Sequence, residues 1–144
     1  MYTVRDILRD KGERMFTTSP DSTVYDALKV MNDNNVGALL VFDKGAMVGI
    51  LSERDYARKM ILRGKHSQDT PVGEIMTTRI ISVTPDQDLE ACMELINSNR
   101  VRHLPVIDGA TVVGIVSIGD VVKGIITHKE LVIEQLEKYI QGQR

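Results

Sequence analysis

The sequence predicts an α+β fold with α/β-type layers, built from two tandem β-α-β-β-α repeats. When the chain is shifted by 65 positions, 13 of the 36 residues in 20–55 are identical to those in 85–120. Both copies contain an amphipathic helical pattern followed by two short aliphatic runs. In both, the last run ends at a serine followed three residues later by an aspartate, which is typical of a helix start.

Each copy is expected to begin with a short β run, residues 15–17 in the first and 80–83 in the second. A helix follows, beginning near residues 21–23 in the first copy and 86–88 in the second. One face of this helix is apolar, because its apolar residues recur at i, i+3, i+4 and i+7. These residues are Val24, Ala27, Leu28 and Met31 in the first copy, and Leu89, Cys92, Met93 and Ile96 in the second.

Two strands then follow in each copy, residues 38–42 and 47–51 in the first, 103–107 and 112–116 in the second. Asp108-Gly109 favours a tight hairpin between the second pair. The nearly continuous aliphatic composition indicates strands covered on both faces. Another helix is expected to start at each serine of the repeated motif.

The predicted boundaries place the first repeat at residues 1–65, the second at 66–128 and a helical tail at 129–144. Four apolar residues of the tail share one helical face: Val132, Leu136, Tyr139 and Ile140. Such a tail is either an extra packing helix or a dimer contact, and the sequence leaves both readings open.

Composition argues against several classes of protein. The net charge of −2 offers no general attraction to nucleic acid or to an anionic membrane. We expect no membrane span, because no run of about 18 apolar residues occurs, and no signal peptide, because the N-terminus has no apolar core. The single cysteine, Cys92, precludes an internal disulfide and favours a reducing cytoplasm. Since Cys92 falls on the apolar helix stripe, we expect it to be buried.

Together with the tandem repeat and its Gly-x-Ser-x-x-Asp motifs, the run Arg-His-Leu-Pro-Val-Ile-Asp at residues 102–108 resembles a CBS-domain pair, or Bateman module. The resemblance covers about residues 4–126 and is greatest to stand-alone bacterial CBS-pair proteins. It implies a pseudo-twofold pair of repeats and a regulatory, non-catalytic role. It also implies an adenosine ligand (AMP, ADP, ATP, NAD(H) or S-adenosylmethionine) in two clefts between the repeats, and a homodimer.

An adenosine phosphate requires an acceptor for the ribose diol, donors and positive charge for phosphate, and an apolar slot for adenine. The resemblance assigns Asp55 and Asp120 to the ribose. The hydroxyls of Ser52 and Ser117 are candidate phosphate donors at helix starts. The alternative is that each Ser-x-x-Asp pair only caps its helix.

Basic residues distinguish the two repeats. Arg102 and His103 of the second repeat are the leading phosphate candidates, because a guanidinium matches phosphate geometry. The alternative is a solvated basic edge. Further phosphate candidates are Arg14, Arg54 and Arg79, and the residues expected to present backbone to adenine are Gly37, Ala38 and Arg102. Because the charges differ, we expect one site to bind nucleotide more tightly than the other.

No P-loop or dinucleotide-binding glycine motif occurs, and His66 and His128 lack metal-ligand spacing. No catalytic residue or metal site is therefore predicted. The leading hypothesis is an energy or redox sensor that binds adenosine nucleotides and changes conformation in response. The alternatives are a constitutive protein-interaction scaffold with vestigial nucleotide clefts, and an enzyme acting on nucleotides, which the residues support least.

Overall fold

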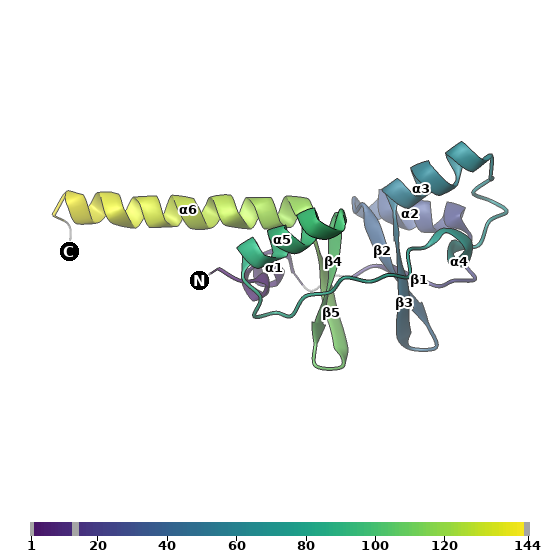
Figure 1. Cartoon of the computed structure of the whole chain (residues 1–144), viewed down its shortest axis with the longest axis horizontal. Helices are drawn as coiled ribbons and strands as arrows, with labels where there is room; N and C mark the ends of the chain where they lie inside the picture. Colours follow the sequence, from purple (N-terminus) through teal and green to yellow (C-terminus); the bar gives the residue numbers. More distant parts are fainter. Residues whose placement is uncertain (1, 13–14, 143–144) are drawn as a thin grey trace. The chain divides into compact units, whose positions relative to one another are not determined.

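Helices and strands follow the predicted order and gather into two compact units (Figure 1). The computed structural model describes residues 2–12 and 15–142. Unit 1 combines Met1–Glu13 with Ile81–Arg144, and unit 2 consists of Arg14–Ile80. The predicted α+β fold class is confirmed.

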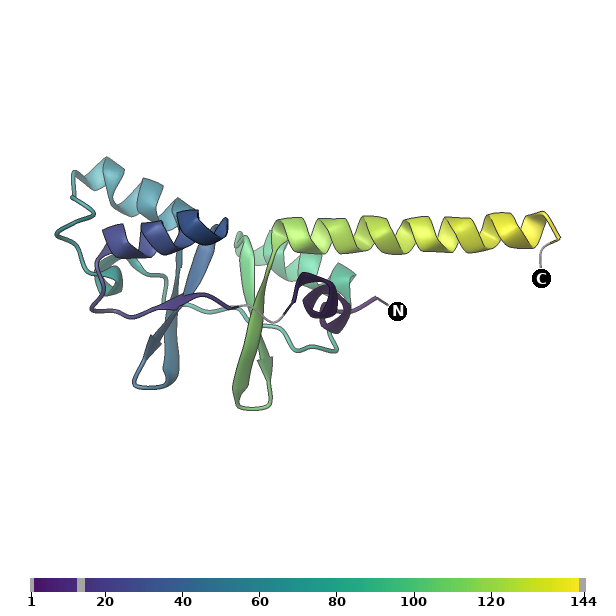
Figure 2. The ribbon, with the colours of Figure 1, turned by 180° about the vertical axis from the view of Figure 1, so that it is seen from behind.

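Unit 2 is built on a three-stranded sheet in the order β1-β2-β3, with β1 parallel to β2 and β2 antiparallel to β3. Its helices lie beside the β2–β3 hairpin (Figure 2). Its elements are β1 (Thr17–Thr18), α2 (Val24–Asn34), β2 (Ala38–Asp43), β3 (Ala46–Ser52), α3 (Glu53–Lys59), the 3-10 turn η1 (Ile61–Arg63) and α4 (Val72–Ile75).

Unit 1 repeats this plan around the antiparallel β4–β5 hairpin. Its elements are α1 (Val4–Lys11), α5 (Leu89–Asn99), β4 (His103–Asp108), β5 (Thr111–Ser117) and α6 (Ile118–Ile140). The β run expected at residues 80–83 contributes one parallel bridge, from Val83 to Val106, within the described part of this unit.

The two hairpins share the same irregularity. The register shifts between Val41 and Phe42 in one hairpin and between Val106 and Ile107 in the other. Both turns also contain a glycine with positive φ, +81° at Gly45 and +63° at Gly109. Because a side chain is disfavoured there, glycine suits both tight turns.

The repeated helices α2 and α5 start where the sequence predicts. The Thr23 hydroxyl accepts a hydrogen bond from the Asp26 N–H, and the Asp88 carboxylate accepts one from the Ala91 N–H. Each satisfies a backbone donor that the first turn leaves unpaired.

Both predicted helix stripes contribute to the hydrophobic cores. Val24, Ala27 and Met31 are buried in unit 2, and Leu89, Cys92 and Ile96 are buried in unit 1. Burial raises the pKa of the Cys92 thiol to about 11, and the Asp88 carboxylate adds to this effect. Cys92 is therefore a buried, protonated packing residue, as the sequence predicts.

The leading segment of each sequence repeat packs on the unit formed by the other repeat. In unit 1, the Val4 N–H donates to the Gln87 carbonyl at 3.0 Å and the Arg5 N–H to the Pro85 carbonyl at 2.8 Å. The compact units therefore differ from the sequence repeats 1–65 and 66–128.

The same exchange occurs in unit 2. The Val72 N–H donates to the Ser22 carbonyl at 2.8 Å, and the Gly73 N–H donates to the Pro20 carbonyl at 3.0 Å. These four residues are the repeat counterparts of those that tie α1 into unit 1. The duplication has therefore preserved the docking of the leading segment together with the repeat.

The tail predicted from residue 129 is not a separate helix, because α6 continues without interruption from Ile118 to Ile140. Its C-terminal half projects beyond the rest of unit 1 (Figure 1). No helix in the described residues has the length and apolarity needed to span a membrane.

Candidate functional site

The Ser-x-x-Asp motif of unit 2 forms a complete capping box at the start of α3. The Asp55 N–H donates to the Ser52 hydroxyl at 3.1 Å, and the Ser52 N–H donates to Asp55 Oδ2 at 3.0 Å. The Ser52 hydroxyl also donates to Asp55 Oδ2 at 3.1 Å. The capping interpretation of the motif is thus confirmed, and any ligand role is additional.

Two further donors reach the other carboxylate oxygen of Asp55. The Thr77 hydroxyl donates to Asp55 Oδ1 at 2.9 Å, and Lys59 Nζ lies 3.0 Å from the same atom. A carboxylate offers about four acceptor positions. All of them are engaged at Asp55, whose side chain is 11% exposed.

Unit 1 repeats the capping box at the start of α6. The Asp120 N–H donates to the Ser117 hydroxyl at 3.0 Å, and the Ser117 N–H donates to Asp120 Oδ2 at 2.9 Å. Lys11 Nζ, at the end of α1, lies 2.7 Å from the same oxygen and also donates to the Ile115 carbonyl at 2.9 Å. The Asp120 side chain is 25% exposed, more than twice the exposure of Asp55.

Opposing effects set the pKa of Asp120. Burial alone raises the pKa of this carboxyl, because it disfavours the charged form. The hydrogen bonds and charge from Lys11, with those from Ser117, outweigh burial and hold the pKa below its ordinary value of 3.8. Asp120 is therefore an ionised acceptor at neutral pH.

The first residues of β2 and β4 lie against these motifs. Ala38 pairs with Ser52, and the Gly37 carbonyl accepts a hydrogen bond from the Glu53 N–H at 3.0 Å. We name the set of Gly37, Ala38, Ser52, Asp55, Lys59 and Thr77 the Asp55 corner.

In unit 1, His103 pairs with Ser117, and the Arg102 carbonyl accepts from the Ile118 N–H at 2.8 Å. The structure thus brings the backbone of both leading phosphate candidates beside the Ser-x-x-Asp motif of their own repeat. Arg102 is exposed and His103 is half-buried. We name the set of Lys11, Arg102, His103, Ser117 and Asp120 the Asp120 corner.

The remaining basic candidates belong to unit 2. Arg54 lies in the first turn of α3, half-buried, and Arg79 is exposed in the extended segment after Thr77. The prediction for Arg14 lies outside the described residues.

Three residues of these corners were missed from sequence: Lys11, Lys59 and Thr77. Lys59 is one helical turn after Asp55, so its i,i+4 spacing was an available signal. Lys11 and Thr77 reach their aspartates only through the docking of the leading segments, which no local pattern reveals.

No cluster of three metal-binding side chains occurs within residues 2–12 and 15–142. His128 stacks on Tyr2 with ring centroids 5.8 Å apart, which gives it a packing role.

Two units of the same β-α-β-β-α plan, each with a capped Ser-x-x-Asp corner, define a tandem module of related domains. The model of the CBS domain family matches residues 4–62 and 72–127. The chain belongs to the CBS-domain family, whose members are generally regulatory, non-catalytic modules.

Named relatives agree with this assignment. The chain is 42% identical over 149 residues to the mitochondrial CBS domain-containing protein CBSX3 of Arabidopsis thaliana, covering 97% of this chain and 72% of that protein. A solved CBS-domain protein of Burkholderia ambifaria is 45% identical, with a TM-score of 0.84 over 87% of this chain and 94% of that one. The resemblance to small proteins consisting of a CBS pair is confirmed.

One similar structure contains ligands. The CBS domain pair of protein MJ0100 was solved in complex with 5′-methylthioadenosine and S-adenosyl-L-methionine. It is 26% identical to this chain, with a TM-score of 0.75 over 88% of this chain and 97% of that one.

Proposed function

We propose that this chain is a regulatory, non-catalytic protein that senses energy or redox state by binding an adenosine nucleotide. The observation that carries the proposal is the Asp120 corner, where an ionised carboxylate, a serine hydroxyl and the Lys11 ammonium meet at the start of a 23-residue helix, with the backbone of Arg102 and His103 alongside. The adenosine ligands of the MJ0100 CBS pair support the same ligand class. Candidates are AMP, ADP, ATP, NAD(H) and S-adenosylmethionine.

Each part of the nucleotide has a proposed partner. Asp120 accepts from the ribose hydroxyls, because three donors among the described residues hold it and a fourth acceptor position remains. Arg102 and His103 bind phosphate together with the Ser117 hydroxyl, which turns from Asp120 to the phosphate, and the N-terminus of α6 assists. The backbone of Arg102 lies against adenine.

The Asp55 corner is proposed as the weaker site. It supplies Asp55 for ribose, Ser52 and Arg54 for phosphate, and the backbone of Gly37 and Ala38 for adenine. Arg79 of the same unit is a further phosphate candidate. Its carboxylate is nearly enclosed, and four donors occupy its acceptor positions. A ribose hydroxyl must therefore displace one of these donors, Thr77, Lys59 or the Ser52 hydroxyl, which lowers the affinity of this corner.

A ligand changes the conformation of such a protein only if it binds one arrangement more tightly than another. We propose a homodimer in a reducing compartment such as the cytoplasm as the functional form. Exposed apolar side chains on α6 and the lone buried thiol of Cys92 support these two statements.

The second candidate function is a constitutive scaffold. The saturated Asp55 favours it, because the capping box, Thr77 and Lys59 together account for all four donors at that carboxylate. Under this hypothesis both corners are structural, and neither binds nucleotide.

Thermal unfolding with each candidate nucleotide tests the proposal. Ligand at 100 times its dissociation constant should stabilise the wild type by about 2.7 kcal/mol. Asp120→Ala should abolish the shift and Asp55→Ala should reduce it less. Absence of any shift in the wild type would support the scaffold, and nucleotide turnover by the pure protein would support an enzyme.

Arg102→Ala separates binding from folding, because Arg102 is exposed and its carbonyl is retained. We expect weaker, less salt-dependent binding with an unchanged melting temperature of the free protein. Unchanged affinity would refute the phosphate assignment.

A further inference from the structure

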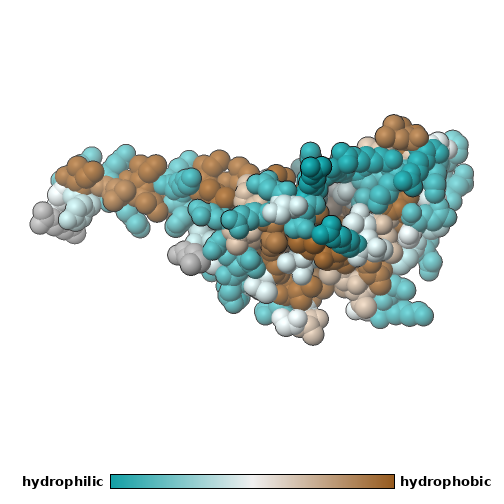
Figure 3. Space-filling view, viewed as in Figure 1, coloured by the Kyte–Doolittle hydropathy of each residue, from teal (hydrophilic) through white to brown (hydrophobic). Residues whose placement is uncertain are grey.

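Helix α6 has an apolar stripe, interrupted at Lys129, that its own unit leaves largely uncovered. Eight apolar residues of the stripe are between 37% and 81% exposed. They are Ile118, Val122, Ile126, Val132, Ile133, Leu136, Tyr139 and Ile140. Figure 3 shows hydrophobic side chains along the projecting half of this helix.

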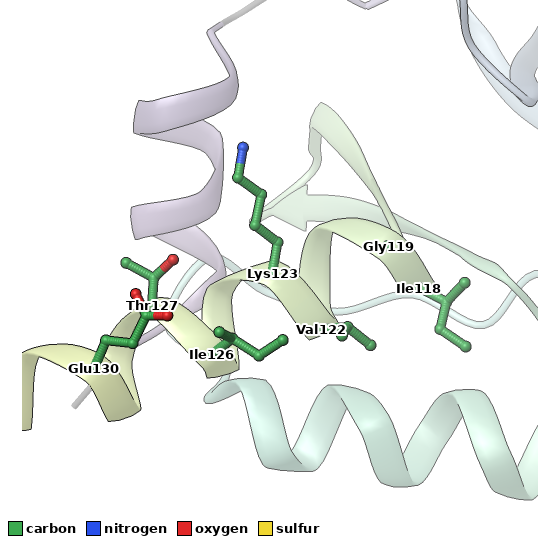
Figure 4. A pocket seen from close by; sticks show the side chains of 7 residues that line it. All are labelled: Ile118, Gly119, Val122, Lys123, Ile126, Thr127 and Glu130. Carbon is green, nitrogen blue, oxygen red and sulfur yellow. The ribbon is translucent and has the colours of Figure 1, made fainter. Parts of the chain in front are cut away.

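The stripe lies next to the side of α6 that packs in unit 1, and Ile125, where the two meet, is partly buried against the core of that unit. Val121 and Gly124 are buried against the unit, whereas Ile118, Val122 and Ile126 border an open groove of about 500 Å³. Figure 4 shows these three apolar side chains pointing to the same side of the helix.

The spacing of the stripe is that of a coiled coil. Successive positions of the stripe are separated alternately by four and three residues: 118, 122, 125, 129, 132, 136 and 139. All are apolar or aromatic except Lys129. Ile126, Ile133 and Ile140 widen the stripe on one side. A sustained heptad pattern with a single polar core position is typical of a helix that pairs with another helix.

The projecting half of α6 has little support from its own chain. Every residue from 129 to 140 is exposed, and its one ion pair between described side chains, Glu134 with Lys138 at 3.4 Å, is exposed as well. Most helical stability in proteins comes from packing of an apolar face. This half of the helix therefore requires a partner.

We propose that the partner is α6 of a second copy of this chain, packed antiparallel along the heptad stripe. A fully accessible Val, Leu or Ile side chain offers roughly 60–120 Å² of apolar surface. Scaling this area by the exposed fraction of each of the eight stripe residues gives about 400 Å² of apolar surface per copy. Interfaces are about 60% apolar, so two copies bury about 1,300 Å² in total, within the range of specific dimers.

Charges beside the stripe favour the antiparallel direction. Lys123, Glu130 and Glu137 are spaced by seven residues and lie on one flank. In a parallel pair this flank faces the opposite flank of the partner helix, so none of these residues lies beside its own counterpart. An antiparallel pair centred near residue 130 brings the same flanks together and places Lys123 beside Glu137 of the partner subunit twice, although Glu130 then lies beside Glu130 of the partner subunit.

This interface rests on the homodimer of the proposed function and not on nucleotide binding. Sedimentation velocity over a range of protein concentrations should show a dimer for the wild type and at least a tenfold weaker dimer for Leu136→Glu. A wild type that remains monomeric overturns both the interface and the homodimer. A dimer unaffected by Leu136→Glu overturns the interface alone.

Charge exchange tests the direction of pairing. Lys123→Glu and Glu137→Lys should each weaken the dimer severalfold, and the double variant should restore it, because each contact then regains opposite charges. Failure of the double variant to restore the dimer overturns the antiparallel arrangement. Both residues are exposed, so circular dichroism should show unchanged folding. Monomeric variants that keep their nucleotide shift leave the proposed function intact.

Discussion

Lys11 Nζ lies 2.7 Å from Asp120 Oδ2, although the two residues are 109 positions apart in the chain. Lys11 also donates to the Ile115 carbonyl, so it ties the end of α1 to both β5 and α6. A residue near the start of the chain thereby completes the Asp120 corner. This relationship makes the leading segment part of the candidate site as well as part of the core.

Replacing Lys11 by methionine should raise the pKa of Asp120 and destabilise unit 1. The pKa rises because the variant loses the ammonium that favours the ionised carboxylate. The stability loss should be only about 1 kcal/mol, since the pair is partly exposed and solvent screens it. Carbon-detected NMR titration and urea unfolding measure these two effects.

Arg9→Met is the matched control. Arg9 is on the same helix, and its ion pair with Asp6 leaves it 68% exposed. Arg9→Met should leave the pKa of Asp120 close to the wild-type value. Equal pKa values for Asp120 in wild type and Lys11→Met would contradict the proposed electrostatic link.

Acid should destabilise the protein through Asp120. The folded-state pKa lies below the ordinary value of 3.8, so the unfolded chain binds the proton more readily. The stabilisation is therefore complete well above pH 4 and is lost as the pH falls through the folded pKa.

Urea unfolding between pH 7 and pH 3 measures this contribution. Asp120→Asn should be less stable than the wild type at pH 7, and the two should converge in acid. A constant difference across that range would show that Asp120 does not contribute to the acid sensitivity.

The sequence predicted most elements because their determinants are local. Thr23 and Asp88 cap helices within three residues of themselves, and Gly109 permits its own turn. The docking of α1 and α4 could not be predicted in the same way. Val4 and Val72 indicate that these segments bury a face, but the pattern does not say against which repeat.

In the candidate site, too, the local features could be predicted from the sequence and the long-range contacts could not. Ser52 with Asp55 and Ser117 with Asp120 are local pairs, so their spacing predicted the capped corners. The number of donors that each carboxylate already accepts depends on Thr77 at Asp55 and on Lys11 at Asp120, and both lie in segments distant in sequence. The sequence therefore predicted an asymmetry of charge but not the saturation of Asp55.

Equivalent glycines of the two β hairpins should respond differently to alanine. A Cβ at Gly49 would lie 3.0 Å from the Thr77 carbonyl oxygen and 2.8 Å from Met76 Sδ. A Cβ at Gly114 would lie 2.9 Å from the end of the flexible Leu8 side chain.

The Thr77 backbone cannot retreat, because it exchanges two hydrogen bonds with Ile50. Overpacking typically lowers the free energy of unfolding by about 1–3 kcal/mol. The loss for Gly49→Ala should lie near the upper end of this range, and the loss for Gly114→Ala near the lower end. Urea unfolding of both variants measures the difference. Equal losses of stability in the two variants would show that the contact of residue 49 with Met76 and Thr77 relaxes as easily as the contact of residue 114 with the Leu8 side chain.

Removing a donor from Asp55 should strengthen the weaker nucleotide site. Thr77→Val keeps the side-chain shape and removes the hydroxyl that donates to Asp55 Oδ1 at 2.9 Å. The freed acceptor position becomes available to a ribose hydroxyl. A hydrogen bond contributes about 1 kcal/mol net, so the second equivalent of AMP should bind roughly fivefold more tightly.

Isothermal titration calorimetry with AMP measures this change. Thr78→Val is the matched control, because Thr78 is the exposed neighbour of Thr77 and should leave both affinities unchanged. A contrary outcome is that the Thr77→Val variant binds AMP tightly at the Asp120 corner and gains no affinity at the second site. That result would contradict the claim that the donors already bound to Asp55 weaken the second site. The cause of the asymmetry would then be the basic residues Arg102 and His103, which Arg102→Ala tests independently.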